Sequence, residues 1–177
     1  MRKRRFSEGL FDIEPIIKEL NISCGQTILD AGCGNGYMSQ IFSKLVGSQG
    51  KVYALDTEKP FIDDLKKETK NTNIIPLVAD ITKKTELEDS SIDLVYLSTV
   101  FHIFSKGQIA GFENEIRRVC KKNAVIAILN IEKEDTPFGP PVEMRSSPEE
   151  LIQKLSFSSD RLIEVDKHFY LQLFNNI

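Results

Sequence analysis

Apolar residues along this chain fall into two kinds of segment, and the two kinds alternate. Short continuous runs rich in Val, Ile and Leu predict strands that are covered on both faces. Stretches in which apolar residues recur every three or four positions predict helices. The predicted strands are residues 27–30, 52–55, 74–79, 92–98 and 124–131, and the predicted helices lie within residues 13–20, 38–46, 61–68, 109–119 and 147–155. This alternation predicts a sheet that is mainly parallel, with helices on both of its faces.

Two further features refine the predicted sheet. Pro76 lies inside the third apolar run, and because proline has no N–H to donate to a neighbouring strand, we expect this strand at an edge. Residues 162–165 and 168–174 are joined by a short connection and predict a hairpin, so at least one of them is antiparallel to the rest. The fold class is therefore α/β, a three-layer αβα sandwich with a C-terminal antiparallel hairpin. We expect one domain over residues 1–177, with residues 1–12 as a basic N-terminal tail.

A cluster of glycines follows the first predicted strand, where residues 28–36 have the sequence ILDAGCGNG. Glycines at such a strand-to-helix turn allow a ligand to approach the backbone closely. A dinucleotide-binding motif requires its third glycine one position later, where this chain has Tyr37. Asp30 would also repel a pyrophosphate, whereas it would not repel a ligand that carries an amino group and a sulfonium. An NAD-dependent oxidoreductase therefore remains only as an alternative, as does a purely structural glycine-rich turn.

This block resembles the first motif of the S-adenosylmethionine-dependent methyltransferases with a Rossmann-like fold (class I). The family pattern is hydrophobic-Leu-Asp-x-Gly-x-Gly-x-Gly, and the chain matches each defined position. The resemblance covers the chain from about residue 13 onward. It implies a seven-stranded sheet in which the last strand is inserted antiparallel beside the fifth. It also implies that the cofactor is S-adenosyl-L-methionine.

Three aspartates, Asp30, Asp56 and Asp80, come at the ends of the first three predicted strands. Ligands of open α/β sheets bind beyond the carboxyl ends of the strands, so these carboxylates are expected to gather at one site. Asp56 follows Gly36 by twenty residues (56 − 36), the spacing at which a strand-end acid accepts from both ribose hydroxyls. A turn or capping role is the alternative for Asp56 and for Asp80.

The resemblance assigns the remaining parts of the cofactor to particular residues. Asp80 would accept a hydrogen bond from the adenine amino group, with the backbone of Ile81 beside it and Thr57 flanking the nucleoside. The amino-acid end and the transferable methyl group would lie near the residues Asp30, Gly32, Gly34, Gly36 and Ser98.

The segment after the fourth strand, residues 98–104, is expected to face the transferable methyl group. His102 is one of two histidines in the chain, and its side chain could remove a proton from an acceptor, since the ordinary pKa of histidine is near 6.5. The alternative is that His102 shapes the pocket. Phe101 and Phe104 could line an acceptor pocket or pack in the core. The long segment 132–147 would cover the acceptor side, with Glu143 and Arg145 as candidate contacts.

Composition and charge exclude several classes of protein. The net charge of −3 gives no general attraction to nucleic acid or anionic membranes, and the basic residues 2–5 are either a solvated tail or a contact for RNA phosphates. No signal-peptide or membrane-spanning run is present, which predicts a cytoplasmic protein without a membrane partner. The three cysteines have no metal-ligand spacing, so we expect free thiols and no metal. Cys33 is expected to fill the tight turn.

The predicted function is methyl transfer from S-adenosylmethionine to a small-molecule acceptor. Residues 98–101, Ser-Thr-Val-Phe, replace the acidic or amide residue, two prolines and aromatic residue of the family's DNA amino-methylating members. No Pro-Cys pair is present for carbon-5 cytosine chemistry, and residues 117–119 resemble the quinone and small-molecule branch. A non-catalytic S-adenosylmethionine-binding module is a further alternative. The sequence predicts neither the acceptor itself nor the oligomeric state.

Overall fold

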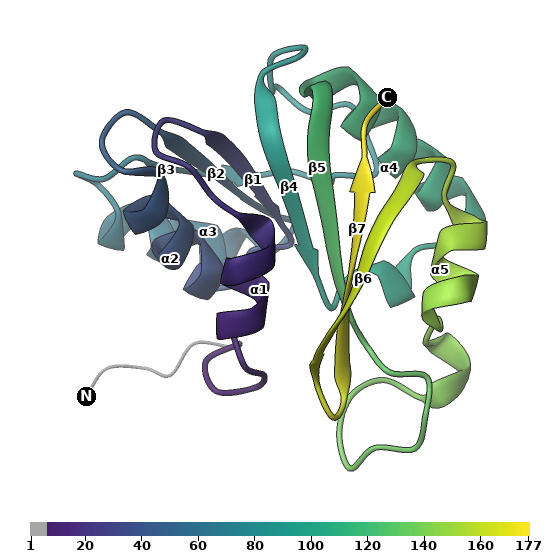
Figure 1. The fold of residues 1–177 in the computed structure, drawn as a ribbon. Helices are drawn as coiled ribbons and strands as arrows, with labels where there is room; N and C mark the ends of the chain where they lie inside the picture. Colours follow the sequence, from purple (N-terminus) through teal and green to yellow (C-terminus); the bar gives the residue numbers. More distant parts are fainter. Residues whose placement is uncertain (1–6) are drawn as a thin grey trace.

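A single seven-stranded sheet lies between two layers of helices (Figure 1). The structure is a computed structural model, and it describes residues 7–177. The basic residues 2–5, for which an RNA contact was one alternative, lie outside the described residues. The elements follow in the order α1 (Glu14–Leu20), β1 (Thr27–Ala31), α2 (Tyr37–Val46), β2 (Lys51–Asp56), α3 (Lys59–Glu68), β3 (Ile74–Val78), β4 (Ile92–Ser98), η1 (Phe101–Ile103), α4 (Lys106–Val119), β5 (Cys120–Ile131), η2 (Val142–Met144), α5 (Pro148–Lys154), β6 (Ser158–Asp166) and β7 (Phe169–Asn175).

The strand order in the sheet is β3-β2-β1-β4-β5-β7-β6. Strands β1 to β5 pair in parallel, whereas β7 pairs antiparallel with both β5 and β6. The predicted α/β sandwich and the antiparallel insertion beside the fifth strand are confirmed. The chain moves outward from β1 to β3 and then returns to β4, so the strand order reverses between β1 and β4. Open sheets of this kind bind ligands at the carboxyl ends of the strands beside that reversal.

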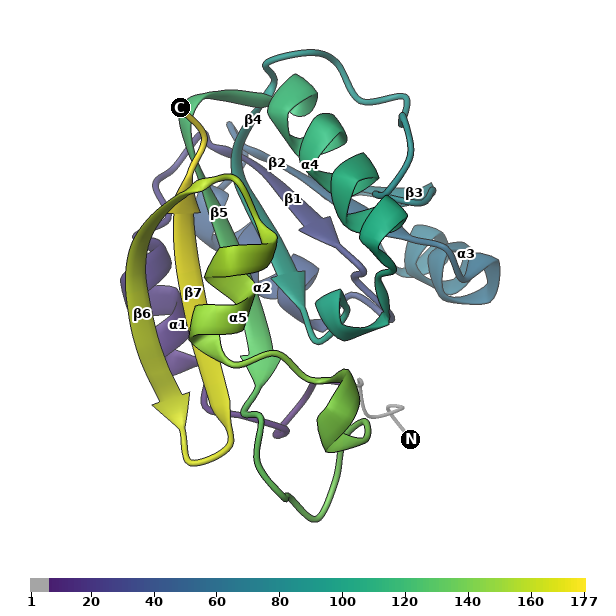
Figure 2. The ribbon, with the colours of Figure 1, turned by 90° about the vertical axis from the view of Figure 1, so that its right-hand side faces the viewer.

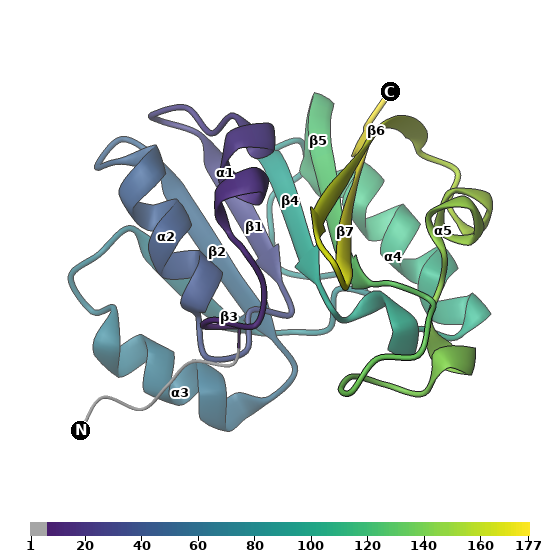
Figure 3. The same cartoon turned by 60° about the horizontal axis from the view of Figure 1, so that its bottom comes forward.

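Helices cover both faces of the sheet (Figures 2 and 3). Each face has its own hydrophobic core. On one face, side chains of α1, α2 and α3 pack against the sheet, with Phe42 and Tyr96 in edge-to-face contact at 5.2 Å between ring centroids. On the other face, Phe112 of α4 and Leu151 of α5 pack against the sheet. Strands β1 and β4 are buried almost throughout, which explains why both are continuous apolar runs in the sequence.

Pro76 lies in β3 at one edge of the sheet, as predicted. Two strands start four residues earlier than predicted. β5 begins at Cys120 rather than at residue 124, and β6 begins at Ser158 rather than at residue 162. In both cases the additional residues are mainly polar and exposed, so the start of the strand carries no apolar signal.

Part of the expected N-terminal tail packs against the domain. Phe11 is buried, and its ring meets that of Phe169 edge to face at 5.3 Å between centroids. The backbone N–H of Asp12 donates to the Asp166 carboxylate. The chain just before α1 is therefore held against the β6–β7 hairpin.

Candidate active site

The turn between β1 and α2 depends on its glycines. Gly32, Gly34 and Gly36 all have positive φ, at 76°, 52° and 75°, a backbone conformation that other residues rarely adopt. A Cβ on Gly32 would lie 2.5 Å from Val100 Cγ2, and one on Gly36 would lie 2.6 Å from Leu65 Cδ1. The first glycine therefore allows the turn to approach the end of β4, and the third allows it to pack against α3.

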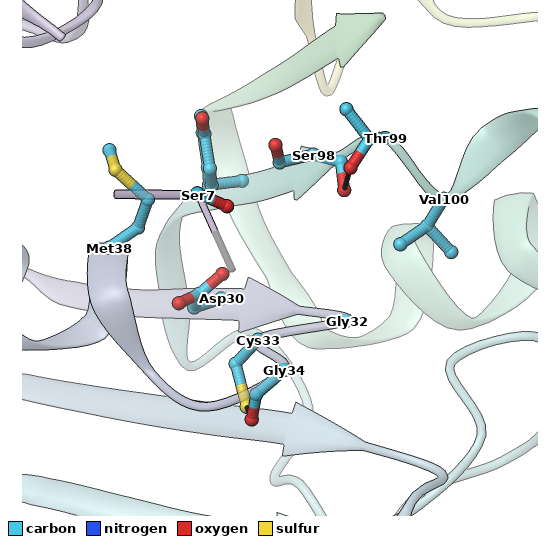
Figure 4. A pocket seen from close by; sticks show the side chains of 10 residues that line it. Ser7, Asp30, Gly32, Cys33, Gly34, Met38, Ser98, Thr99 and Val100 are labelled. Atoms are coloured by element: carbon cyan, nitrogen blue, oxygen red, sulfur yellow. Dashed lines mark hydrogen bonds between the residues drawn. The ribbon is translucent and has the colours of Figure 1, made fainter. Parts of the chain in front are cut away.

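Two adjoining cavities lie beside this turn. The first, here called the Asp30 cavity, has a volume of about 220 Å³, and Figure 4 shows Asp30 between the glycine turn and the end of β4. The second, here called the Asp56 cavity, has a volume of about 360 Å³. The Asp30 cavity is lined by Ser7, Asp30, Gly32, Cys33, Gly34, Met38, Tyr96, Ser98, Thr99 and Val100. The Asp56 cavity is lined by Gly32, Gly34, Leu55, Asp56, Thr57, Glu58, Phe61, Ala79, Asp80, Ile81, Val100 and Ile103. Three residues, Gly32, Gly34 and Val100, line both cavities, so the two cavities adjoin.

The Asp30 carboxyl is almost completely buried, with 2% of the residue exposed. Its Oδ2 accepts a hydrogen bond from Ser39 Oγ at 2.5 Å. Burial, with a smaller contribution from the negative charge of Asp56, raises the pKa of Asp30 to about 7. Burial also raises the pKa of the neighbouring Cys33 thiol well above its ordinary value, so that thiol stays protonated. This state agrees with the expectation that Cys33 is not a nucleophile.

Asp56 and Asp80 both line the Asp56 cavity. The Asp56 carboxylate accepts from the backbone N–H of Gly34 at 2.8 Å and from that of Glu58 at 2.9 Å. It therefore joins the glycine turn to the end of β2. The three predicted acids thus gather at one rim of the sheet.

The Asp80 carboxylate is held by the residues that follow it. Its Oδ1 accepts from the backbone N–H of Thr82 at 2.9 Å and from Thr82 Oγ1 at 2.7 Å. Burial alone would raise the pKa of Asp80, but the hydrogen bonds from Thr82 and the ion pair with Lys83 outweigh it and lower the pKa. Asp80 therefore carries a negative charge at neutral pH.

Most of the other predicted site residues line a cavity, but two do not. Ser98 lines the Asp30 cavity, and Thr57 and Ile81 line the Asp56 cavity. Gly36 instead forms the N-cap of α2, and His102 lies in η1 outside both linings.

His102 is half-buried beside the 132–147 segment. Burial and the positive charge of Arg145 both lower the pKa of His102. Its neighbours Val100 and Ile103 line the Asp56 cavity. Phe101 is buried in the core, which favours the packing alternative over an acceptor contact.

The 132–147 segment is organised by Arg145. The buried Arg145 guanidinium donates hydrogen bonds to four backbone carbonyls of its own segment, those of Glu132, Glu134, Phe138 and Pro140. These contacts use four of its five N–H groups. The segment itself therefore occupies most of the Arg145 side chain, and an acceptor contact by Arg145 stays a prediction. Glu143 is exposed in η2.

Sequence reasoning missed several lining residues of the Asp30 cavity, among them Met38 of α2 and Tyr96 of β4, whereas Thr99 and Val100 belong to the segment 98–104 that was expected at the site. Tyr96 could have been found, because residues two apart in a strand point to the same face and Tyr96 precedes Ser98 by two. Thr99 has a φ of 55°, a strained value for a β-branched residue, and its backbone N–H donates to Leu129 O at 2.8 Å. Nothing in the local sequence indicates this conformation.

A sheet with this strand order, a glycine turn after β1 and acids at the ends of β1 and β2 is typical of the class I S-adenosylmethionine-dependent methyltransferases. Residues 28–123 match the family model described as a methyltransferase domain, and the chain belongs to this family. A crystal structure of an S-adenosylmethionine-dependent methyltransferase from Aquifex aeolicus is 30% identical with a TM-score of 0.87, covering 97% of this chain and 93% of that one. These matches speak against an NAD-dependent oxidoreductase.

Curated relatives are similar over part of their length. The demethylmenaquinone methyltransferase of Staphylococcus saprophyticus is 28% identical over 122 residues, which are 69% of this chain and 52% of that protein. The protein-L-isoaspartate O-methyltransferase of Methanococcus maripaludis is 32% identical over 84 residues, which are 46% of this chain and 39% of that protein. The chain thus spans about half the length, or less, of these curated relatives.

The residues present fit S-adenosylmethionine, the cofactor of this family. The Asp30 cavity offers a buried carboxyl group and hydroxyl groups, which suit the ammonium group of the amino-acid end. The Asp56 cavity combines apolar walls with two carboxylates, which suit a nucleoside whose hydroxyl and amino groups donate hydrogen bonds. Within residues 7–177, no cluster of metal-ligating side chains is present, and no helix is long and apolar enough to cross a membrane.

Proposed function

We propose that this chain transfers a methyl group from S-adenosylmethionine to a small-molecule acceptor. The observation that carries the proposal is the pair of adjoining cavities, each lined by at least one acid, at the point where the strand order reverses. The family match supports the reaction type, and the cavities support the cofactor.

Each part of the cofactor has its own proposed contacts. Asp30 and the end of β4 at Ser98 bind the amino-acid end, while Gly32 and Gly34 allow the backbone to approach it. Asp56 accepts from the ribose hydroxyls, because a carboxylate offers two acceptor oxygens. Thr57, Asp80 and Ile81 surround the adenine, and Gly36 supports the turn without a direct contact.

When bound, S-adenosylmethionine supplies a sulfonium methyl group that is open to in-line displacement. The chain's own contribution is to position the acceptor and to keep water away from it. Val100 lines both cavities, so it is well placed to separate the reacting centre from the adenosine side.

His102 is the proposed base, because its lowered pKa keeps the imidazole neutral and able to accept a proton at pH 7. The alternative is a shaping role. In a rate–pH profile of the active chain, an acidic limb, along which the rate falls as His102 becomes protonated, supports the base role if it disappears in His102→Asn. An unchanged profile assigns His102 to shape alone.

The small-molecule acceptor is supported by the demethylmenaquinone methyltransferases among the relatives. The exposed apolar side chains of Ile103 and Met144 suit an acceptor with an apolar part. Ile103 lines the Asp56 cavity. Met144 belongs to the 132–147 segment, in which the positive charge of Arg145 lowers the pKa of His102.

A second candidate is a module that binds S-adenosylmethionine without catalysis. The observation that favours it is that His102 lies outside the linings of both cavities. Formation of S-adenosylhomocysteine in the presence of quinols, phenols, thiols or amines would establish the enzyme. Tight cofactor binding without turnover of any of these acceptors would establish the module.

Calorimetry with S-adenosylmethionine, S-adenosylhomocysteine and NAD tests the cofactor assignment. We expect dissociation constants in the micromolar range for the first two and no binding of NAD. Asp56→Ala should abolish binding, because it removes the acceptor of the ribose hydroxyls. Asp63→Ala is the matched control, since Asp63 lies exposed on α3 and pairs with Lys59 outside the cavities. Equal binding by both variants would remove Asp56 from the site.

A further inference from the structure

Two segments that border the site meet at the tip of the β6–β7 hairpin. The first, here called the N-terminal strap, is residues 7–12, of which Ser7 lines the Asp30 cavity (Figure 4). The second is the 132–147 segment, which carries Arg145, the residue whose charge acts on His102. Both segments lie at the end of the molecule that holds the hairpin tip (Figures 1 and 2). Because they are far apart in the sequence, any link between them depends on what the hairpin contacts.

Phe169, the first residue of β7, contacts both segments. Its ring meets the Phe11 ring edge to face at 5.3 Å between centroids, and it stacks on the Phe138 ring at 6.0 Å. Phe169 is 2% exposed and belongs to the core on the side of α1, so its own position is fixed by packing. Phe169 is therefore an aromatic residue that the strap and the 132–147 segment share.

The polar groups of the hairpin tip add a hydrogen bond to each segment. The Asp166 carboxylate accepts from the backbone N–H of Asp12 at 3.4 Å, and also from those of His168 at 2.8 Å and Phe169 at 3.1 Å. On the other side, the backbone N–H of Glu132 donates to His168 O at 2.8 Å. The same turn of the chain therefore holds both segments.

We infer that Phe169 is a positioning residue that couples the two segments, so that a ligand held in the Asp30 cavity against Ser7 also orders the 132–147 segment on the acceptor side. The inference rests on the proposed function. It adds a link between the cofactor and the acceptor side through a residue that lines neither cavity.

The strap can transmit the effect of a ligand because it is short. The backbone N–H of Leu10 donates to Ser7 O at 3.2 Å, so one turn joins Ser7 to Phe11. Residues 7–12 belong to no helix or strand, so their position depends on this turn and on the contacts at the hairpin tip. A ligand that contacts Ser7 therefore favours the arrangement in which Phe11 lies against Phe169. Coupling between sites is reciprocal, so loosening either segment must also weaken the binding of that ligand.

Contacts within the 132–147 segment carry the effect to the acceptor side. Phe138 O accepts a hydrogen bond from Arg145 Nη2 at 3.1 Å, so a Phe138 ring that rests on Phe169 also holds Arg145 in place. The backbone N–H groups of Met144 and Arg145 donate to carbonyls of the same segment. Their rates of hydrogen exchange therefore report how often the segment opens.

Hydrogen exchange with and without ligand tests the coupling. S-adenosylhomocysteine should slow exchange in the strap and at Met144 and Arg145. The ligand 5′-methylthioadenosine lacks the amino-acid end, so it should slow exchange at the end of β2 and not in the 132–147 segment. Phe169→Leu keeps an apolar side chain but removes the ring, and in it S-adenosylhomocysteine should no longer slow exchange at Met144 and Arg145. Its affinity should fall about five-fold, the low end of typical couplings, because the strap is no longer held over the cavity.

Two further variants separate coupling from stability. Phe138→Leu removes the other ring of the stack at a position that is 38% exposed, so the chain should fold. In this variant the ligand should still slow exchange in the strap but not in the 132–147 segment. Phe157→Leu is the matched control, since Phe157 is buried and contacts Phe112 in the core on the opposite face of the sheet. It should lower the melting temperature and leave the response of both segments to the ligand unchanged.

Each outcome decides the inference. If S-adenosylhomocysteine binds the unmodified chain without slowing exchange in the 132–147 segment, the coupling is overturned and the proposed function stands. If the slowing persists in both Phe169→Leu and Phe138→Leu, the two segments are not linked through these rings, and the role of Phe169 is overturned. If S-adenosylhomocysteine does not bind the unmodified chain, the proposed function fails, and the coupling fails with it.

Discussion

At the scale of single residues, Asp30 is the most perturbed acid of the candidate site. Its burial favours the protonated carboxyl in the folded chain, where the pKa is about 7 against 3.8 for the ordinary side chain. The contribution of Asp30 to folding is therefore full below about pH 4 and is lost as the pH rises toward 7. A cationic ligand reverses this preference, because it stabilises the ionised carboxylate.

We predict that the affinity for S-adenosylhomocysteine increases as the pH rises through about 7 and levels off above it. Below that pH, binding must displace one proton from Asp30, so the affinity should change by up to ten-fold per pH unit. Calorimetry in two buffers of different ionisation enthalpy measures the released proton directly.

Asp30→Asn is the control for this pH dependence, since the amide cannot ionise. Its binding should be weaker than that of the unmodified chain at pH 8 and flat between pH 6 and 8. Its melting temperature should also stay level over that range, whereas that of the unmodified chain falls. A pH dependence that persists in Asp30→Asn would assign the titration to another group.

At the scale of elements, α4 makes a close contact with the segment after β3, which carries Asp80 and Ile81. A Cβ on Gly111 of α4 would lie 2.1 Å from the backbone oxygen of Thr82. Thr82 in turn donates both of its hydrogen bonds to Asp80. Helix α4 therefore packs against Thr82, the residue that holds the Asp80 carboxylate, although no residue of α4 lines either cavity.

We predict that Gly111→Ala destabilises the chain by about 1–3 kcal/mol, because backbone atoms must move to admit the methyl group. The displaced segment carries Asp80 and Ile81, so the affinity for adenosine ligands should fall as well. Chemical denaturation and calorimetry measure the two effects.

Gly107→Ala in the same helix is the matched control. A Cβ at Gly107 meets no atom within 4 Å, so alanine should stabilise the helix by up to about 1 kcal/mol and leave binding unchanged. If the two variants have the same stability, the close approach of α4 to Thr82 is not a feature of the folded chain.

The 132–147 segment is stabilised by hydrogen bonds between its own residues. One buried guanidinium satisfies four of its carbonyl groups, and Phe138 stacks on Phe169 at 6.0 Å between ring centroids. A segment of this length can keep a defined conformation when a buried cation joins its carbonyls, because unpaired buried carbonyls are costly. Its composition of charges and prolines predicted only a loop.

At the scale of the whole molecule, the two cavities join both halves of the sheet. The Asp30 cavity lies over β1 and β4, and the Asp56 cavity reaches the ends of β2 and β3. A ligand that fills both cavities therefore contacts strands from both sides of the reversal. Such a ligand binds the folded chain and not the unfolded one, so it stabilises the entire fold.

We predict that S-adenosylhomocysteine at one hundred times its dissociation constant raises the melting temperature by roughly 5–10 °C. This follows from a stabilisation of about 2.7 kcal/mol and a response of roughly 2–4 °C per kcal/mol for a chain of this size. Thermal unfolding with NAD at the same concentration is the control and should show no shift. Equal shifts with both ligands would contradict the cofactor assignment.

The sequence by itself determined the elements and much of the site. Continuous apolar runs are a direct consequence of burial on both faces, so the five parallel strands were predictable, and Pro76 marked an edge. The three acids were also predictable, because the end of a strand is a local feature and parallel strands end at one rim. The polar starts of β5 and β6 were not, since exposed residues leave no hydrophobic pattern.

Only the tertiary structure decided how distant residues meet. The pairing of Asp30 with Tyr96 depends on the register between β1 and β4, which packing across the whole sheet establishes. The use of Arg145 inside its own segment, and the position of His102 outside both linings, depend in the same way on contacts between remote parts of the chain. Periodicity reports which face of an element is buried, whereas the partner of a buried side chain is fixed only when the layers pack together.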